Sequence, residues 1–101
     1  MNYFSRAGVD YTGRTAESII DLICIEFGIT KEKLNSKCRL RHVVDARTIA
    51  AYHLHKKLGF SSLATGLKLN RNHASILHLC KKAEGLIEVD KEFKQLINKF
   101  I

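Results

Sequence analysis

Proline and tryptophan are absent from this 101-residue sequence, and only three cysteines are present. Without proline, no position forces a break in a helix, and the apolar residues recur at three-and-four spacing instead of alternating. Both features predict an all-α fold. Cys24, Cys38 and Cys80 are odd in number and form no C-x-x-C pair, so we expect free thiols and a reducing compartment.

Long apolar runs are also missing. Asp21 and Glu26 interrupt the most apolar segment, SIIDLICIEFGI, and the first 14 residues have no apolar core long enough for a signal peptide. We therefore expect a cytoplasmic protein that does not contact a membrane. The length predicts one domain over residues 15–101, preceded by a loose arm over residues 1–14.

Capping residues divide the chain into a compact bundle of about five or six helices. Residues 35–41, NSKCRLR, have no apolar periodicity and are predicted to form a loop. The first expected helix runs from Thr15 to about Phe27 with Gly28 as its stop, and one further turn around Leu34 is capped by Thr30. A long helix over residues 42–58 ends at Gly59, and a short helix follows from Ser61 or Ser62 through Leu67. After a tight turn at KLNR come a helix over residues 72–87 and a last helix capped by Asp90.

Each longer helix has one apolar face that we expect to be buried. The predicted inward residues are Ile19, Ile20, Ile23, Cys24 and Phe27; Val43, Ala46, Ala50, Leu54 and Leu58; Ile76, Leu77, Cys80 and Ala83; and Phe93, Leu96, Ile97 and Phe100.

Positive charge is concentrated in the middle of the chain. The formal net charge is +7, yet residues 31–83 contain twelve Lys and Arg against only Glu32 and Asp45, while the rest of the chain is net acidic. A solvated surface would scatter its charges, whereas a face that binds a polyanion gathers them. The distribution favours a phosphate-rich partner whose binding depends on salt.

The short helix, tight turn and longer helix between residues 61 and 87 have the layout of a helix-turn-helix, whose second helix enters the major groove of DNA. That second helix begins with the sequence RNHASILHLCKK, residues 71–82. Its first turn carries polar and basic side chains where free backbone N–H groups and the positive end of the helix dipole suit phosphate contact. The alternative is that Asn72 only caps the helix and His73 is an ordinary surface histidine.

RNHASILHLCKKAEGL resembles the signature of domain IV, the C-terminal DNA-binding domain of the bacterial replication initiator DnaA, commonly R-D-H-T-T-V-x-H-A-x-K/R-K. Upstream, SKCRLRHVVDARTIAAYHL is similar to the family's basic loop and following helix, and DKEFKQLI is similar to its closing helix. The resemblance covers about residues 15–100 and implies a Trp-repressor-like helix-turn-helix fold.

The resemblance also implies which residues contact DNA bases. Arg39 in the basic loop would reach the minor groove, while Asn72, His73, Ala74 and Ser75 would address the major groove. Asn72 replaces the family's Asp and can pair with adenine, Ala74 can touch a thymine methyl group, and Ser75 keeps a hydroxyl. The expected phosphate contacts are Lys37, Arg41, Arg47, Lys68, Arg71 and the backbone N–H groups near Ser62 and Leu63.

Three features depart from the family pattern. Cys38 stands at a position that is often Arg, and the turn LKLNRNH is about two residues shorter than usual. The family's full-length members also carry a nucleotide-hydrolysing domain for which this chain has no room. In GVDYTGRT, residues 8–15, Arg14 replaces the Lys of a phosphate loop and no apolar strand precedes Gly8.

No other chemistry is indicated by the sequence. His53 and His55 point in different directions on a helix, and Cys38, His42, His78 and Cys80 lack zinc-site spacing. No nucleophile motif joins Ser, His and Asp, so we expect a non-enzyme without catalytic residues, cofactor or metal.

We expect a monomeric, sequence-specific double-stranded DNA-binding module for boxes related to the family's TTATNCACA element. Lacking an ATPase, it would be an accessory factor or regulator of replication initiation or transcription, encoded by a bacterium or a phage, with another replication protein as a possible further partner. Two alternatives stay open: a module whose basic face binds an acidic protein, and an RNA binder. RNA binding is disfavoured because exposed aromatic platforms are few.

Overall fold

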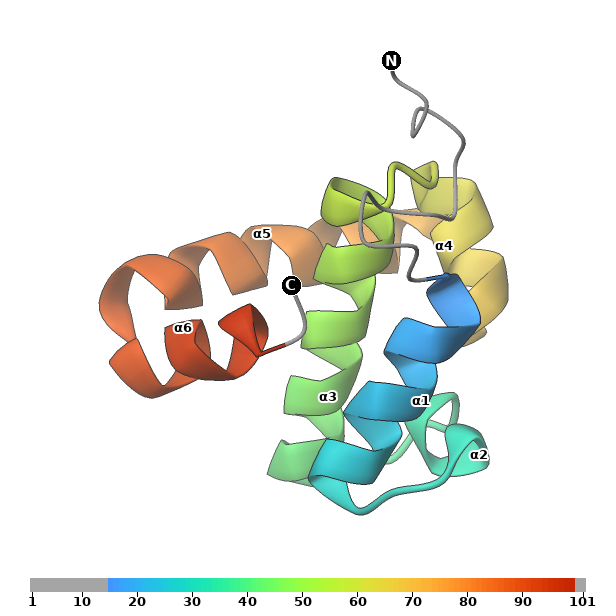
Figure 1. Ribbon diagram of the computed structural model, residues 1–101. Coiled ribbons are helices and arrows are strands. Elements are labelled where there is room, and N and C mark those ends of the chain that lie inside the picture. The colour runs from blue at the N-terminus through green and yellow to red at the C-terminus, as the bar shows by residue number, and fades with distance from the viewer. Residues whose placement is uncertain (1–14, 100–101) are drawn as a thin grey trace.

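The computed structural model describes residues 15–99, which form six α-helices and one π-helical turn (Figure 1). The predicted arm over residues 1–14 and the predicted core residue Phe100 lie outside the described residues. In chain order the elements are α1 (Ala16–Phe27), α2 (Lys31–Leu34), α3 (Arg41–Tyr52), the π-turn (His53–Lys57), α4 (Ser62–Leu69), α5 (His73–Val89) and α6 (Lys91–Asn98).

Capping side chains begin all of these α-helices except α3. The residues Thr15, Thr30, Ser61, Asn72 and Asp90 each accept a hydrogen bond from a backbone N–H in the first turn of the adjoining helix. Such caps satisfy donors that have no partner within the helix. Gly28, in the left-handed conformation with φ 66°, ends α1 as predicted.

The predicted helix over residues 42–58 begins one residue earlier and contains a π-turn. Within this turn the N–H of Leu58 donates to the carbonyl of His53, five residues back, across 2.9 Å. The wider turn inserts one residue and rotates the end of the helix about its axis, a change that apolar periodicity does not reveal. Gly59, with φ 81°, follows Leu58, which ends the predicted helix, as expected.

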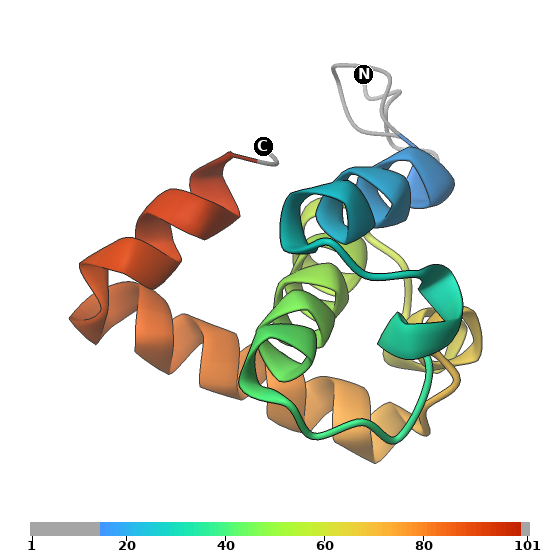
Figure 2. The same cartoon turned by 90° about the horizontal axis from the view of Figure 1, so that it is seen from below.

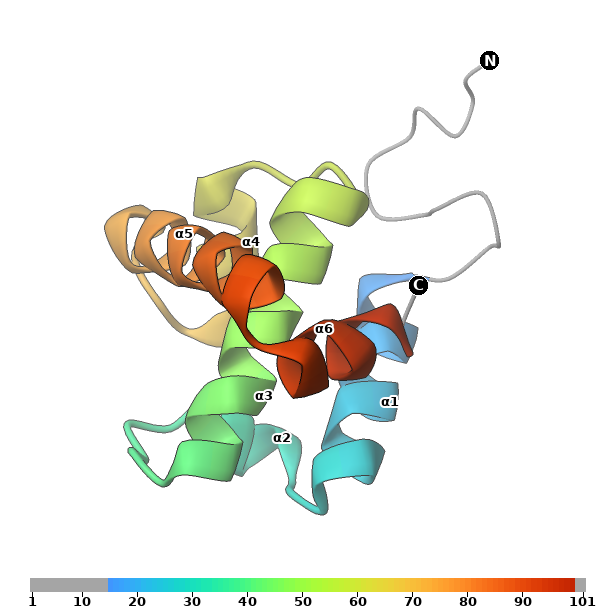
Figure 3. The same ribbon diagram turned by 90° about the vertical axis from the view of Figure 1, so that its left-hand side faces the viewer.

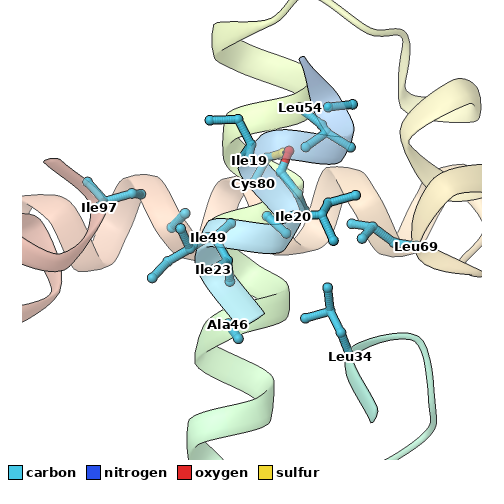
Figure 4. Close-up of a cluster of buried hydrophobic side chains, with 14 of the residues drawn as sticks. Ile19, Ile20, Ile23, Leu34, Ala46, Ile49, Leu54, Leu69, Cys80 and Ile97 are labelled. Carbon is cyan, nitrogen blue, oxygen red and sulfur yellow. The ribbon is translucent and has the colours of Figure 1, made fainter. Parts of the chain in front are cut away.

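Helix α3 lies at the centre of the fold. It runs between α1 and α5 (Figure 1), and its Ala46, Ile49, Ala50 and Ala51 have no exposed surface. The small alanines allow the neighbouring helices to approach closely. Figure 4 shows isoleucines of α1 meeting Ile49 and Ala46, with Cys80, Leu69, Leu34 and Ile97 arriving from other elements.

One predicted core residue is exposed. Leu77 on α5 has 49% of its surface exposed, whereas Ile76, Cys80 and Ala83 are buried as expected. The prediction for Leu77 was wrong because the buried stripe of α5 continues from Ile76 through Leu79 and Cys80 to Ala83, and Leu77 lies beside it.

The C-terminal helix α6 folds back beside α5 and extends toward α1 (Figure 3). Phe93 and Ile97 bury its apolar face, and the ammonium group of Lys99 lies 3.0 Å from a carboxylate oxygen of Glu26 on α1. Across residues 15–99, no helix combines the length and apolar character needed to span a membrane.

Candidate nucleic-acid interface

Helices α4 and α5 form the predicted helix-turn-helix. Asn70, in the left-handed conformation with φ 56°, ends α4, and the N–H of Arg71 donates to the carbonyl of Gly66 across 2.7 Å. This bond, from the second residue after α4 back into its last turn, is typical of a Schellman motif. A Cβ atom on Gly66 would overlap the backbone oxygen of Arg71, so glycine is required for this close approach.

The start of α5 presents exposed side chains, as the sequence predicts for a reading helix. His73 and Ala74 are exposed and Ser75 is half-buried. Asn72 is the N-cap, because its Oδ1 accepts a hydrogen bond from the N–H of Ser75 across 2.8 Å. Its Nδ2 amide and one remaining lone pair of Oδ1 are available to a partner, so capping and base contact draw on the same side chain.

The basic loop, residues 35–40 between α2 and α3, passes beside the start of α5 (Figure 2). Lys37, Arg39 and Leu40 are exposed along it, while Asn35, Ser36 and Cys38 are partly buried. The Oγ of Ser36 accepts the N–H of Cys38 across 3.1 Å and donates to the carbonyl of Lys33 across 2.7 Å. Because these bonds fold the start of the loop back on α2, the exposed cations project away from the core.

Two arginines join the basic loop to the rest of the fold. From α3, Arg47 donates through Nε to the carbonyl of Leu34 across 3.0 Å and through Nη2 to that of Ser36 across 2.9 Å. Arg71 donates through Nη1 to the carbonyl of Asn35 across 3.2 Å and that of Asn70 across 2.9 Å, and through Nη2 to that of Ser36. The loop and the helix-turn-helix are thereby attached to each other.

Burial lowers the pKa of both guanidinium groups, and for Arg47 the neighbouring charge of Arg71 lowers the pKa further. Both groups nevertheless remain protonated at neutral pH, as arginine does in proteins. The pair therefore places two positive charges beneath the surface between the loop and α5.

A basic pocket of about 480 Å³ separates the basic loop from α5. No acidic residue is among its lining residues, which are Lys37, Arg39, Val44, Arg47, Asn70, Arg71, Asn72, Ser75, His78, Leu79 and Lys82. Arg39 and the start of α5, which lie more than thirty residues apart in sequence, therefore border the same pocket. Of the residues predicted to contact bases, Arg39, Asn72 and Ser75 border this pocket, whereas His73 and Ala74 are not among its lining residues.

His78 and Lys82 border this pocket but were not assigned to the interface from sequence. Both are exposed on the face of α5 that carries Ser75, at three-residue and seven-residue spacing from it. Helical periodicity counted from Ser75 would have found them, since residues three, four and seven apart share one face.

The remaining predicted phosphate contacts differ in their surroundings. Arg41 is 89% exposed and lies 3.8 Å from a carboxylate oxygen of Asp45, while Nζ of Lys68 lies 3.1 Å from Oε2 of Glu17. The N–H groups of Ser62 and Leu63 lie in the first turn of α4, where no acceptor exists within the helix. Arg47 differs most from the prediction, because only 6% of it is exposed and its Nε and Nη2 already donate to protein carbonyls.

Comparison with known proteins gives one consistent result. The family model "Bacterial dnaA protein helix-turn-helix" matches residues 16–83. The chromosomal replication initiator protein DnaA of Bacteroides thetaiotaomicron is 37% identical over 81 residues, which cover 79% of this chain and 17% of that protein. DnaA of Flavobacterium psychrophilum is also 37% identical, over 73 residues that cover 71% of this chain and 15% of the relative. The chain thus spans less than a fifth of the length of these curated relatives.

Proposed function

The chain belongs to the bacterial DnaA helix-turn-helix family, a family of DNA-binding domains, and on this premise we propose that it reads boxes related to TTATNCACA in double-stranded DNA. One observation carries the proposal: Arg39 and the start of α5 border the same basic pocket. Adjacent minor and major grooves are separated by one sugar–phosphate strand, so two reading elements on either side of a basic pocket fit neighbouring grooves.

Each reading element suits one half of the box. An arginine inserted into the minor groove is favoured where A·T pairs narrow it, which assigns Arg39 to the TTAT half. The first turn of α5 then enters the adjacent major groove at the CACA half, with His73, Ala74 and Ser75 toward the base edges. Asn72 contributes through its Nδ2 amide while its Oδ1 caps the helix.

Phosphate contacts position the domain without reading sequence. We assign these contacts to the exposed cations Lys37 and Arg41, to the partly exposed Lys68 and to the N–H groups of Ser62 and Leu63, and we add Lys82 at the end of the pocket. Arg47 and Arg71 lie beneath this layer, and their charge adds to the positive potential of the pocket.

The proposed biological role is occupation of such boxes in replication initiation or transcription. Residues 15–99 contribute a binding surface to that role, and we assign them neither catalysis nor a cofactor. We further propose that the domain binds as a monomer, because a box read by one loop and one helix needs no second copy.

The experiment compares binding to a duplex carrying the box, a scrambled duplex and an RNA of matching sequence, each at two salt concentrations. Contact with about six phosphates predicts a slope of log affinity against log salt near −5, and the box is expected to bind at least about tenfold tighter than the scramble. Equal affinity for the two duplexes would refute sequence reading. Absence of duplex binding at low salt would favour an acidic protein as the partner of the basic face.

A further inference from the structure

The carbonyl of Ser36 accepts hydrogen bonds from two arginines that belong to different elements. Arg47 reaches it from α3 and Arg71 from the turn between α4 and α5. The same two side chains also bind the carbonyls of Leu34 and Asn35, so three consecutive carbonyls at the start of the basic loop are held. This part of the loop is positioned through its backbone and depends on no side chain of its own for these contacts.

Neither arginine has a carboxylate partner among the ion pairs of residues 15–99. Placing two guanidinium groups close together and partly out of water is unfavourable unless their hydrogen bonds are satisfied. The lowered pKa of Arg47 agrees with this cost, since burial and the charge of Arg71 both lower it. The hydrogen bonds that the two arginines donate to the carbonyls of residues 34–36 must offset this cost.

We propose that Arg47 and Arg71 are positioning residues that determine sequence specificity by setting where the basic loop lies relative to the reading helix α5. This inference rests on the proposed function, because it assumes that Arg39 and α5 read the two halves of one box. If the loop moves independently of α5, Arg39 can occupy the minor groove only by ordering the loop at the moment of binding, which reduces the discrimination gained there.

The guanidinium group is suited to this role and an ammonium group is not. Arg47 uses Nε and Nη2 on two different carbonyls, and Arg71 uses Nη1 and Nη2 on three. A lysine keeps the positive charge but has a single compact head on a flexible stem, so it cannot hold the same carbonyls in a fixed plane. Substitution by lysine therefore separates positioning from charge.

The first experiment measures which half of the box each variant still reads. Arg47→Lys and Arg71→Lys are compared with Arg41→Lys, which changes an exposed arginine that binds no loop carbonyl and that the proposed function assigns to a phosphate. Four duplexes are used: the box, the box with its TTAT half replaced, the box with its CACA half replaced, and a scramble. Thermal melting confirms that each variant is folded at the assay temperature.

For Arg47→Lys and Arg71→Lys we expect the preference for the intact TTAT half to fall by about fivefold or more, within the range of discrimination that one base contact supplies. Preference at the CACA half, affinity for the scramble and the salt slope are expected to stay within about twofold, because the charge is kept. A residue that only contacts phosphate would instead tolerate lysine at both halves. A general loss of structure would reduce both preferences together. Either pattern would overturn the inference.

A second experiment needs no DNA. Amide hydrogen exchange of the free protein is expected to accelerate in both variants at the basic loop, including the Cys38 N–H, while α5 core amides such as that of Cys80 keep their protection. Unchanged exchange in the loop would overturn the inference even if box binding is intact. If the parent protein does not distinguish box from scramble, the proposed function fails, and the exchange result still decides whether the arginines hold the loop. Should Arg47→Lys be unfolded, Arg71→Lys alone decides.

Discussion

The imidazole ring of His53 hydrogen-bonds to the backbone of Ile97, 44 residues further along the chain. Its Nε2 lies 3.1 Å from the carbonyl oxygen, and only 2% of the residue is exposed. Since a carbonyl only accepts, Nε2 carries the proton. The contact joins the π-turn to α6, and neither residue lines the basic pocket, so it supports the fold and not the proposed DNA interface.

Replacing His53 by alanine is therefore expected to destabilise the protein without changing which DNA it prefers. The substitution removes a buried ring and leaves the carbonyl of Ile97 without this donor, which together cost about 3 kcal/mol. His55→Ala is the matched control, because His55 is less buried and binds the nearby carbonyl of Phe60. Chemical denaturation measures the free energy of unfolding of both variants. A smaller effect at His53 than at His55 would contradict the assigned role.

Two glycines should respond to alanine in opposite directions. Gly66→Ala places a Cβ against the backbone oxygen of Arg71, so we expect a loss of about 1–3 kcal/mol in the free energy of unfolding and weaker DNA binding through a displaced turn. Gly85→Ala meets no neighbour within 4 Å in the interior of α5, so a gain of about 0.5–1 kcal/mol is expected. Thermal and denaturant unfolding decide, and equal effects would show that the close approach at Gly66 is unimportant.

The ion pair between Lys68 and Glu17 should compete with DNA. The hydrogen bond from Lys68 and its charge lower the pKa of Glu17, so the carboxylate is charged at neutral pH and draws the ammonium group away from a phosphate. Glu17→Gln is expected to raise affinity for every duplex by about twofold to threefold, whereas Lys68→Ala lowers it and reduces the salt slope by about one. Asp21→Asn, which releases Lys31 on the neighbouring α2, serves as a control for net charge. Equal gains from the two neutral variants would argue against a specific role for Lys68.

His73 is expected to contribute to preference more than to affinity. It is exposed at the first position of α5 and lies where a helix in the major groove meets base edges. His73→Ala should reduce the preference for the box over the scramble by about tenfold, with affinity for the scramble unchanged within about twofold. Lys81→Ala removes an exposed charge on α5 that is assigned to no base contact, and it should instead weaken both duplexes alike. The reverse pattern would mean that the two roles have been exchanged.

The three cysteines should differ in reactivity. Burial raises the pKa of the Cys80 thiol to about 11 and also raises that of Cys24, whereas Cys38 is partly exposed in the basic loop. Thiolate is the reactive form, so iodoacetamide at pH 8 is expected to label Cys38 first and the other two only after unfolding. Because the folded pKa of Cys80 lies above its ordinary 9.0, its neutral thiol favours folding below about pH 9, and this contribution is lost as the pH rises through about 11. Rapid native labelling of Cys80 would show that the core opens.

Much of the fold could be predicted from local chemistry. Thr15, Thr30 and Asp90 cap helices because a short polar side chain before an apolar-periodic run satisfies free N–H groups, and this depends on neighbours in sequence alone. The π-turn at His53–Lys57 depends on how helices pack across the core and leaves no mark in the spacing of apolar residues. The exposure of Leu77, in contrast, follows from helical spacing, because Ile76, Leu79, Cys80 and Ala83 share one face and Leu77 lies beside it.

The sequence likewise predicted one part of the candidate interface and missed another. The motifs around Arg39 and His73 indicated two reading elements, and the structure brings Arg39 and the start of α5 to one pocket. Arg47 and Arg71 could be identified only as cations, because their partners are the carbonyls of residues 34–36, and backbone acceptors are the same for every amino acid. A sequence reveals charge, but it does not reveal which backbone groups will accept its hydrogen bonds.

Because the two arginines bind main-chain oxygens, they place few restrictions on the sequence of the basic loop. Any amino acid at positions 34–36 offers the same carbonyl oxygen, so these hydrogen bonds from Arg47 and Arg71 do not depend on which side chains stand there. Substitutions at residues 37–40, which follow these three positions, are expected to leave the anchoring hydrogen bonds in place. On the proposed function, we therefore expect substitutions within this stretch to change target preference while the anchored carbonyls keep their arginine partners.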